Sequence, residues 1–75
     1  MTKEEARSLK PGDLIRIGEP DLTGPPYSVA TIRQHKGIVV KVISVHEDKH
    51  IVIHVAELDD MHLWETEIEA LVYTS

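Results

Sequence analysis

The sequence predicts a small all-β domain, and three observations lead to this prediction. Residues 36–58 contain two runs rich in valine and isoleucine, separated by the polar break Glu47-Asp48-Lys49, which is the pattern of a β-hairpin. Shorter apolar segments of strand-like length lie before and after this hairpin. The 75 residues suit one domain, so we take residues 1–75 as a single unit with one core.

Residues 2–17 predict a short helix, a turn and a first strand. Thr2 and Glu5 have the spacing of a capping box. Because so short a helix is not stable alone, we expect Leu9 to dock it on the sheet. Pro11-Gly12-Asp13 predicts a turn, and residues 14–17 predict the first strand.

Residues 18–27 contain two glycines and three prolines and predict a long loop. Long loops in small domains often have a functional role. The alternative is a crossover that spans one end of the sheet and is held by Tyr27. The segment Pro25-Pro26-Tyr27 is stiff, and we take these three residues as candidates for contact with a partner.

Residues 28–35 are interpreted as an irregular strand that leads to Gly37. Arg33, His35 and Lys36 form a local basic cluster. Such clusters are usually solvated, and the alternative is contact with an anion or a partner. We include Arg33 and His35 among the candidate contact residues.

The hairpin is apolar on both faces if residues 47–49 are its turn. Two interpretations remain open: a bent strand buried on both sides in a small barrel, or a second face that contacts another subunit or partner. One side would hold Val39, Ile43, Val45, Ile51, Ile53 and Val55. The other side would hold Ile38, Val40, Val42 and Val52, with Ser44, His46, His50 and His54.

The carboxy-terminal third predicts two more strands with a helical turn between them. Residues 61–65 alternate and predict a fourth strand, which includes Trp64. Thr66 and Glu69 have capping-box spacing and predict a single helical turn. Residues 70–74 predict the last strand.

Three segments of the chain resemble a known fold: residues 10–16 (KPGDLIR), residues 37–42 (GIVVKV) and residues 64–69 (WETEIE). Their order is similar to that of the small barrels related to the Src-homology-3 (SH3) domain. Such barrels include the KOW barrels linked to ribosomes and transcription, the ferrous-iron-transport accessory barrels, and short barrels of bacteria and tailed phages. The resemblance covers nearly the whole chain after Pro11. It implies a five-stranded SH3-like antiparallel barrel with a short N-terminal helix and one helical turn before the last strand, and it specifies fold more than function.

Composition argues against several functions. The net charge is −5, and from Glu57 onward there are six acids and no Lys or Arg, whereas nucleic-acid-binding proteins usually present a basic stripe. Recognition of proline-rich peptides, as in some relatives, needs several aromatic residues, but this chain has only Tyr27, Trp64 and Tyr73. We also expect no membrane association, because no apolar run approaches the roughly 20 residues that cross a bilayer and residues 1–5 lack a secretory apolar core.

The sequence gives no sign of an enzyme. Cysteine is absent, no serine lies in a nucleophile motif, and a barrel this small encloses no substrate cavity. We therefore predict no catalytic residues, no cofactor and no small-molecule substrate, and we assign no metal ligands. His50 and His54 would lie about 13 Å apart on one strand, so His46 and His50 across the turn are the one pair considered for a weak metal site. The same histidines would make the hairpin pH-sensitive below about 6.5.

The most direct interpretation is a non-enzymatic protein–protein interaction or assembly module, such as an accessory or structural protein of a bacterium or phage. Its partner would be another protein or a second copy of the chain, in the cytoplasm or in a virion. Trp64 joins the candidate contact residues named above. The two alternatives are a barrel associated with nucleic acid or the ribosome and a regulatory barrel linked to a metal.

Overall fold

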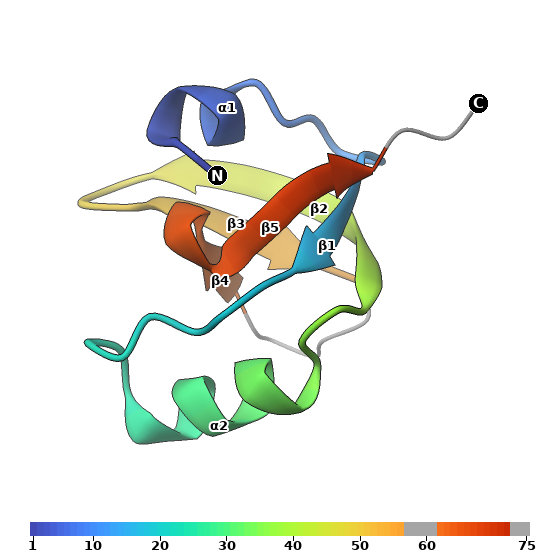
Figure 1. Cartoon of the computed structure of the whole chain (residues 1–75). Coiled ribbons are helices and arrows are strands. Elements are labelled where there is room, and N and C mark those ends of the chain that lie inside the picture. Colours follow the sequence, from blue (N-terminus) through green and yellow to red (C-terminus); the bar gives the residue numbers. More distant parts are fainter. Residues whose placement is uncertain (57–61, 73–75) are drawn as a thin grey trace.

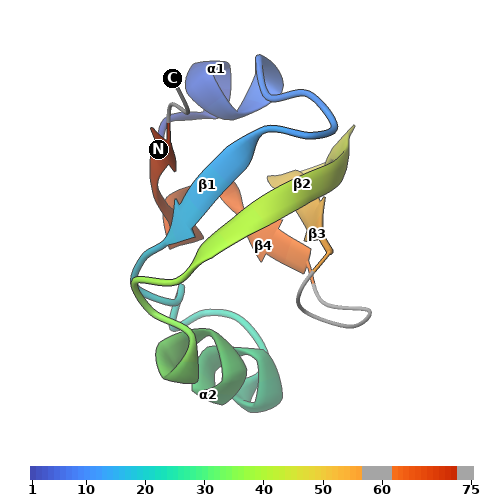
Figure 2. The same ribbon diagram turned by 90° about the vertical axis from the view of Figure 1, so that its right-hand side faces the viewer.

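A computed structural model of the whole chain describes residues 1–56 and 62–72. The described residues form a five-stranded antiparallel sheet with a short helix at each end (Figures 1 and 2). The elements are α1 (Lys3–Arg7), β1 (Leu14–Ile17), α2 (Pro26–Gln34), β2 (Val39–Glu47), β3 (Ile51–Val55), β4 (His62–Trp64), the 3₁₀ turn η1 (Glu65–Glu67) and β5 (Ile68–Val72).

The strands lie in the order β4-β3-β2-β1-β5, and every neighbouring pair is antiparallel. Consecutive strands are therefore neighbours except for β5, which returns to pair with β1. Among the described residues the sheet is not closed, so β4 and β5 are its edges. The long strand β2 pairs with β1 through its first residues and with β3 through its last.

The core lies on the concave side of the sheet, where residues of the strands pack with residues of the two helices. Ala6 packs into it from α1, Leu9 from the segment just after α1, and Ile32 from α2. The strands supply Ile15, Ile17, Val40, Val42, Ile51, Ile53, Val55, Leu63 and Ile68.

The predicted N-terminal helix and the turn after it are confirmed. The side chain of Thr2 accepts a hydrogen bond from the Glu5 amide, and the Glu5 carboxylate accepts one from the Thr2 amide, which completes the capping box. Leu9 is buried against the sheet, as expected. Gly12 has φ +98°, a conformation that glycine adopts without strain, and it allows the chain to turn into β1.

The irregular strand predicted for residues 28–35 is wrong, because residues 26–34 form the helix α2. The β-branched residues Val29, Thr31 and Ile32 favoured a strand by propensity. Pro26 occupies the first turn of the helix, where its fixed φ suits helical geometry and its missing N–H costs nothing. Burial of Ile32 then stabilises the helix, and the predicted loop is correspondingly shorter.

The hairpin is confirmed, and its predicted faces hold for β3 and for residues 44–46 but not for the first half of β2. The register of β2 and β3 shifts between Val42 and Ser44, which is a β-bulge at Ile43. The bulge places Val40 and Val42 on the buried side with Ile51, whereas Ile43 is 53% exposed. The two faces therefore exchange residues halfway along β2, and Val39 and Ile43 do not reach the core.

The bounds of the helical turn and of the last strand also differ from the prediction. The helical turn is η1, one residue earlier than Thr66, and the capping carboxylate is that of Glu67, which accepts from the amide of Trp64 at 2.9 Å. The last strand begins at Ile68 rather than at residue 70. Met61 and Tyr73 lie outside the described residues.

Candidate functional site

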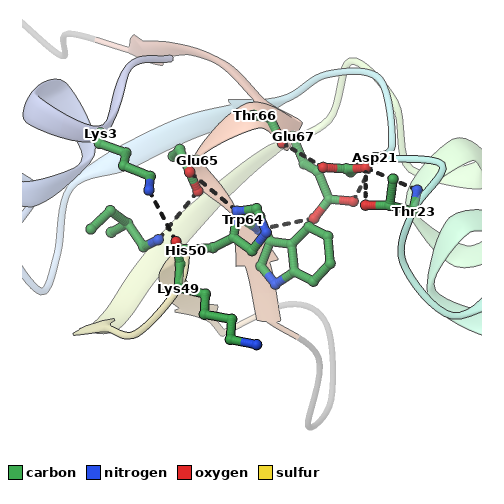
Figure 3. A network of polar contacts seen from close by, with 10 residues as sticks. Lys3, Asp21, Thr23, Lys49, His50, Trp64, Glu65, Thr66 and Glu67 are labelled. Carbon is green, nitrogen blue, oxygen red and sulfur yellow. Dashed lines mark hydrogen bonds and ion pairs between the residues drawn. The ribbon is translucent and has the colours of Figure 1, made fainter.

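Trp64 lies at the end of β4 with its indole ring half-buried on the convex side of the sheet. Its ring stacks on the imidazole of His50, with centroids 4.1 Å apart and planes inclined by 10° (Figure 3). Gly24, in the connection between β1 and β2, lies against the far edge of the indole. A Cβ built at that glycine would be 3.7 Å from Trp64 Cη2. The connection therefore folds back onto the tryptophan.

A pocket of about 230 Å³ lies between this connection and the turn after β4. It joins residues that are about 40 positions apart in the sequence, since one wall comes from the start of α2 and the other from β4 and η1. The lining residues are Gly24, Pro25, Ser28, His62, Trp64 and Glu67.

The buried carboxylate of Glu67 fixes the geometry of this pocket. Glu67 is 5% exposed, and its two oxygens accept hydrogen bonds from the amides of Trp64 and Asp21, each at 2.9 Å (Figure 3). One side chain thus ties the turn after β4 to the β1–β2 connection. Because both amides are satisfied by the same carboxylate, the two walls of the pocket are held at a fixed separation.

Asp21 extends this network toward solvent. Its Oδ1 accepts from the hydroxyl of Thr23 at 2.6 Å and from the Thr23 amide at 2.9 Å. The hydroxyl and amide of Thr23 hold the pKa of the Asp21 carboxyl below its usual value, with the amide as the second cause. Thr66 Oγ1 donates to the other oxygen at 3.4 Å, so the connection is also tied to η1 itself.

Glu65 plays a similar part on the other side of Trp64. It is 3% exposed and accepts from the amide of Ile51 at 3.2 Å. The Nδ1 atom of His50 lies 3.3 Å from its other oxygen. This contact orients the imidazole that stacks on Trp64, so the indole is held from one side by His50 and from the other by the pocket wall.

The structure brings together some of the predicted contact residues and separates others. Pro25 and Trp64 line the same pocket. Pro26 and Tyr27 begin α2 directly beside it, and the Tyr27 side chain is 80% exposed. Pro26 and Tyr27 are therefore next to lining residues in the chain but do not line the pocket themselves.

Arg33 and His35 lie at the opposite end of α2, about 9 and 12 Å along the helix from Tyr27 at 1.5 Å per residue. His35 Nδ1 lies 2.7 Å from the carbonyl oxygen of Thr31, and Lys36 forms an ion pair with Glu19. The basic cluster is therefore partly engaged within the chain, and it is not part of the pocket.

Sequence reasoning missed His62 and Glu67 as pocket residues. His62 is two positions before Trp64 on one strand, so the two side chains share a face. Glu67 is three positions after Trp64, which is the spacing of a capping carboxylate. Both signals are present in the sequence, but without the position of α2 they do not indicate a pocket.

A larger, more open groove of about 570 Å³ lies between α1 and β2. The ion pair of Arg7 and Glu47 crosses it at 2.9 Å, and Arg7 lowers the pKa of the Glu47 carboxyl. It is lined by Arg7, Leu9, Pro11, Ser44, Val45, Glu47 and Ile51. None of the predicted contact residues lies in this groove.

Three further histidines form a row across the sheet. His46, His54 and His62 come from β2, β3 and β4, and neighbouring rings have centroids 5.5 and 5.4 Å apart. The pair predicted from sequence, His46 with His50, is not the one the structure brings together: His46 contacts His54, whereas His50 stacks on Trp64. Within residues 1–56 and 62–72, no group of three or more His, Cys, Asp or Glu is placed to hold a metal ion.

Comparisons with known proteins give no relative. No protein-family model matches the chain, and no curated protein and no solved structure matches it either. Within the described residues, no helix has the length and apolar character needed to span a bilayer.

Proposed function

We propose that this chain is a non-enzymatic protein–protein interaction or assembly module that binds its partner at the Trp64 pocket. One observation supports this most directly: Pro25 and Trp64, far apart in the sequence, line one pocket beside the exposed ring of Tyr27. Aromatic residues are enriched at the centres of protein interfaces, where they contribute much of the binding energy.

The size of the pocket favours a protein partner over a small-molecule substrate. Sites for small ligands are typically about 300–1,000 Å³. The pocket at Trp64 has about 230 Å³, which suits one inserted side chain rather than a whole substrate. A partner that inserts one side chain there would extend its contact over the surrounding surface.

Two large apolar side chains close in the chain to the pocket are exposed to solvent. Leu22 and Tyr27 are 73% and 80% exposed, and both are adjacent in the chain to residues of the pocket or its hydrogen-bond network. Single exposed apolar residues are ordinary, but we propose that these two extend the contact surface of the pocket, because each is next in the chain to a residue of the pocket or its network. We call Leu22, Pro25, Tyr27 and Trp64 the contact patch.

The fold to which we assign the chain is the small SH3-like barrel. The order β4-β3-β2-β1-β5, the bulged strand β2 that pairs with both β1 and β3, and the 3₁₀ turn before β5 support this assignment. In such an arrangement the β1–β2 connection and the turn before the last strand meet at one end, where the contact patch lies.

Association with nucleic acid or the ribosome receives less support. Of the predicted basic cluster, Lys36 is paired with Glu19 and His35 is bonded to the carbonyl of Thr31. Two buried carboxylates, Glu65 and Glu67, lie beside Trp64 and would repel a phosphate backbone there.

The proposal can be tested with a substitution that fills the pocket. Ser28 is half-buried in the pocket wall, so Ser28→Phe should occupy the space without removing any present contact. Wild-type protein would be used to select peptides from a display library, and its mass would be measured by light scattering at micromolar concentration. We expect either selected peptides or self-association, and in both cases Ser28→Phe should abolish the binding.

The matched control is Ile43→Ser, which removes an exposed apolar side chain on β2, away from the contact patch. Binding should survive this change. A strictly monomeric protein that selects no peptide, or binding that Ile43→Ser removes and Ser28→Phe leaves intact, would contradict the proposal.

A further inference from the structure

We propose that His54 and His62 form a binding site for a divalent late transition-metal ion such as Zn²⁺ or Cu²⁺. His54 on β3 and His62 on β4 are direct register partners. Directly opposite residues of antiparallel strands project side by side from the same face of the sheet. The two imidazoles therefore approach each other from rigid backbone positions, which reduces the cost of placing both on one ion.

The separation of the two rings fits a shared ion. A tetrahedral ion about 2.0–2.1 Å from one nitrogen of each imidazole places the ring centroids roughly 5 Å apart. The centroids of His54 and His62 are 5.4 Å apart, with planes inclined by 43°. Small rotations of the two side chains would direct one nitrogen of each ring to a common point.

The ring nitrogens of this pair are available as ligands. Among the described residues, no hydrogen bond is found to a ring nitrogen of His54 or His62, whereas His35 and His50 use Nδ1 within the fold. Imidazole prefers zinc, copper and nickel, while magnesium and calcium prefer oxygen ligands.

His46 is a neighbour of this pair and not its third ligand. Its register partner is Val52, so it lies diagonally to His54, and its Nε2 is 3.3 Å from Ser44 Oγ. The described residues provide no third ligand at this place. Water or a group from a partner would complete the coordination, so we expect weak, micromolar-range binding rather than a structural metal site.

The proposed metal site shares no residue with the contact patch, although His62 also lines the pocket. The experiment is a calorimetric titration of the full chain with zinc chloride, with magnesium chloride as the comparison ion. We expect zinc to bind and magnesium not to bind. His54→Gln and His62→Gln should each weaken zinc binding by about tenfold or more, because even outer-shell partners of a metal site are worth that much.

The controls are His46→Gln and His35→Gln, and both should leave zinc affinity within about threefold of wild type. A spectroscopic readout needs no variant: zinc should shift the imidazole NMR signals of His54 and His62 and leave that of His35 unchanged. No zinc binding, or a loss with His46→Gln equal to that with His62→Gln, would overturn the assignment.

Discussion

The two faces of the β2–β3–β4 part of the sheet come from alternating residues of the same strands, yet their chemistry is opposite. The concave face is apolar and buried, with Val42, Ile51, Ile53, Val55 and Leu63. The convex face has aromatic rings and half-buried or exposed side chains, namely His46, His54, His62 and Trp64. Core residues and the residues that we propose for binding therefore alternate along each strand. Substitutions should therefore affect stability on one face and binding on the other.

The largest expected effect is on the concave face. Ile53 is fully buried at the centre of the core, so Ile53→Ala removes apolar contacts and leaves a cavity. We expect it to lower the free energy of unfolding by about 2–5 kcal/mol, measured by urea denaturation followed by circular dichroism. In a domain of this size that loss removes most of the stability.

The matched control for this change is Val52→Ala, the neighbouring residue on the other face. Val52 is half-buried and pairs with His46 and Trp64, so its truncation should cost about 1 kcal/mol or less. Equal losses at residues 52 and 53 would show that β3 is buried on both sides and would remove the distinction between the faces.

The second prediction concerns the carboxylate that connects the convex face to the β1–β2 connection. In Glu67→Gln the amide nitrogen replaces one oxygen and cannot accept a hydrogen bond, so the amide of either Trp64 or Asp21 loses its partner. A buried N–H left unpaired costs about 1–3 kcal/mol. Thermal and urea denaturation should both show the loss.

Glu69→Gln is the control for Glu67, because it makes the same chemical change at an exposed position of β5. Its unfolding free energy should stay within about 0.5 kcal/mol of wild type. If both variants lose equal stability, the effect would come from net charge and not from the hydrogen bonds of Glu67.

The third prediction tests the bulge in β2. Ile43 is 53% exposed, so Ile43→Thr should change the free energy of unfolding by no more than about 0.5 kcal/mol. A loss of several kcal/mol would place Ile43 in a core or in an interface with a second copy. Repeating the denaturation at two protein concentrations separates these two cases.

The same bulge explains which parts of the fold can be predicted from the sequence. The capping box of Thr2 and Glu5, the turn at Gly12 and the hairpin depend on residues close in the chain, and each was predicted correctly. The prediction that Ile43 shares a face with Ile51 and Ile53 assumed strict alternation, and one extra residue in β2 is enough to reverse it. The strand predicted for residues 28–35 failed because its propensity was outweighed by a tertiary contact of Ile32.

The Trp64 pocket could be predicted only in part, because it depends on contacts between distant parts of the chain. Pro25, Tyr27 and Trp64 were candidates because proline and aromatic residues suit contact surfaces. That Pro25 and Trp64 line one pocket depends on α2 and on the hydrogen bonds of Glu67, which join distant parts of the chain. The pairing of His54 with His62 depends on the register between β3 and β4 and was not expected from the sequence.

The smallest effect is on the ionisation of Asp21, which lies where the connection meets the turn after β4. The hydroxyl of Thr23 is the main cause that lowers the pKa of this carboxyl below its usual 3.8. Because the folded pKa is lowered, the stabilisation is present above pH 3.8 and is lost as pH falls through the folded value. Thr23→Val removes the hydroxyl and should raise the pKa of Asp21 toward its usual value in a carboxyl-detected NMR titration, whereas Thr23→Ser should leave it low. An unchanged pKa in the valine variant would mean that the amide of Thr23 alone sets the ionisation of Asp21, and the hydroxyl would then have no part in holding the connection against the convex face.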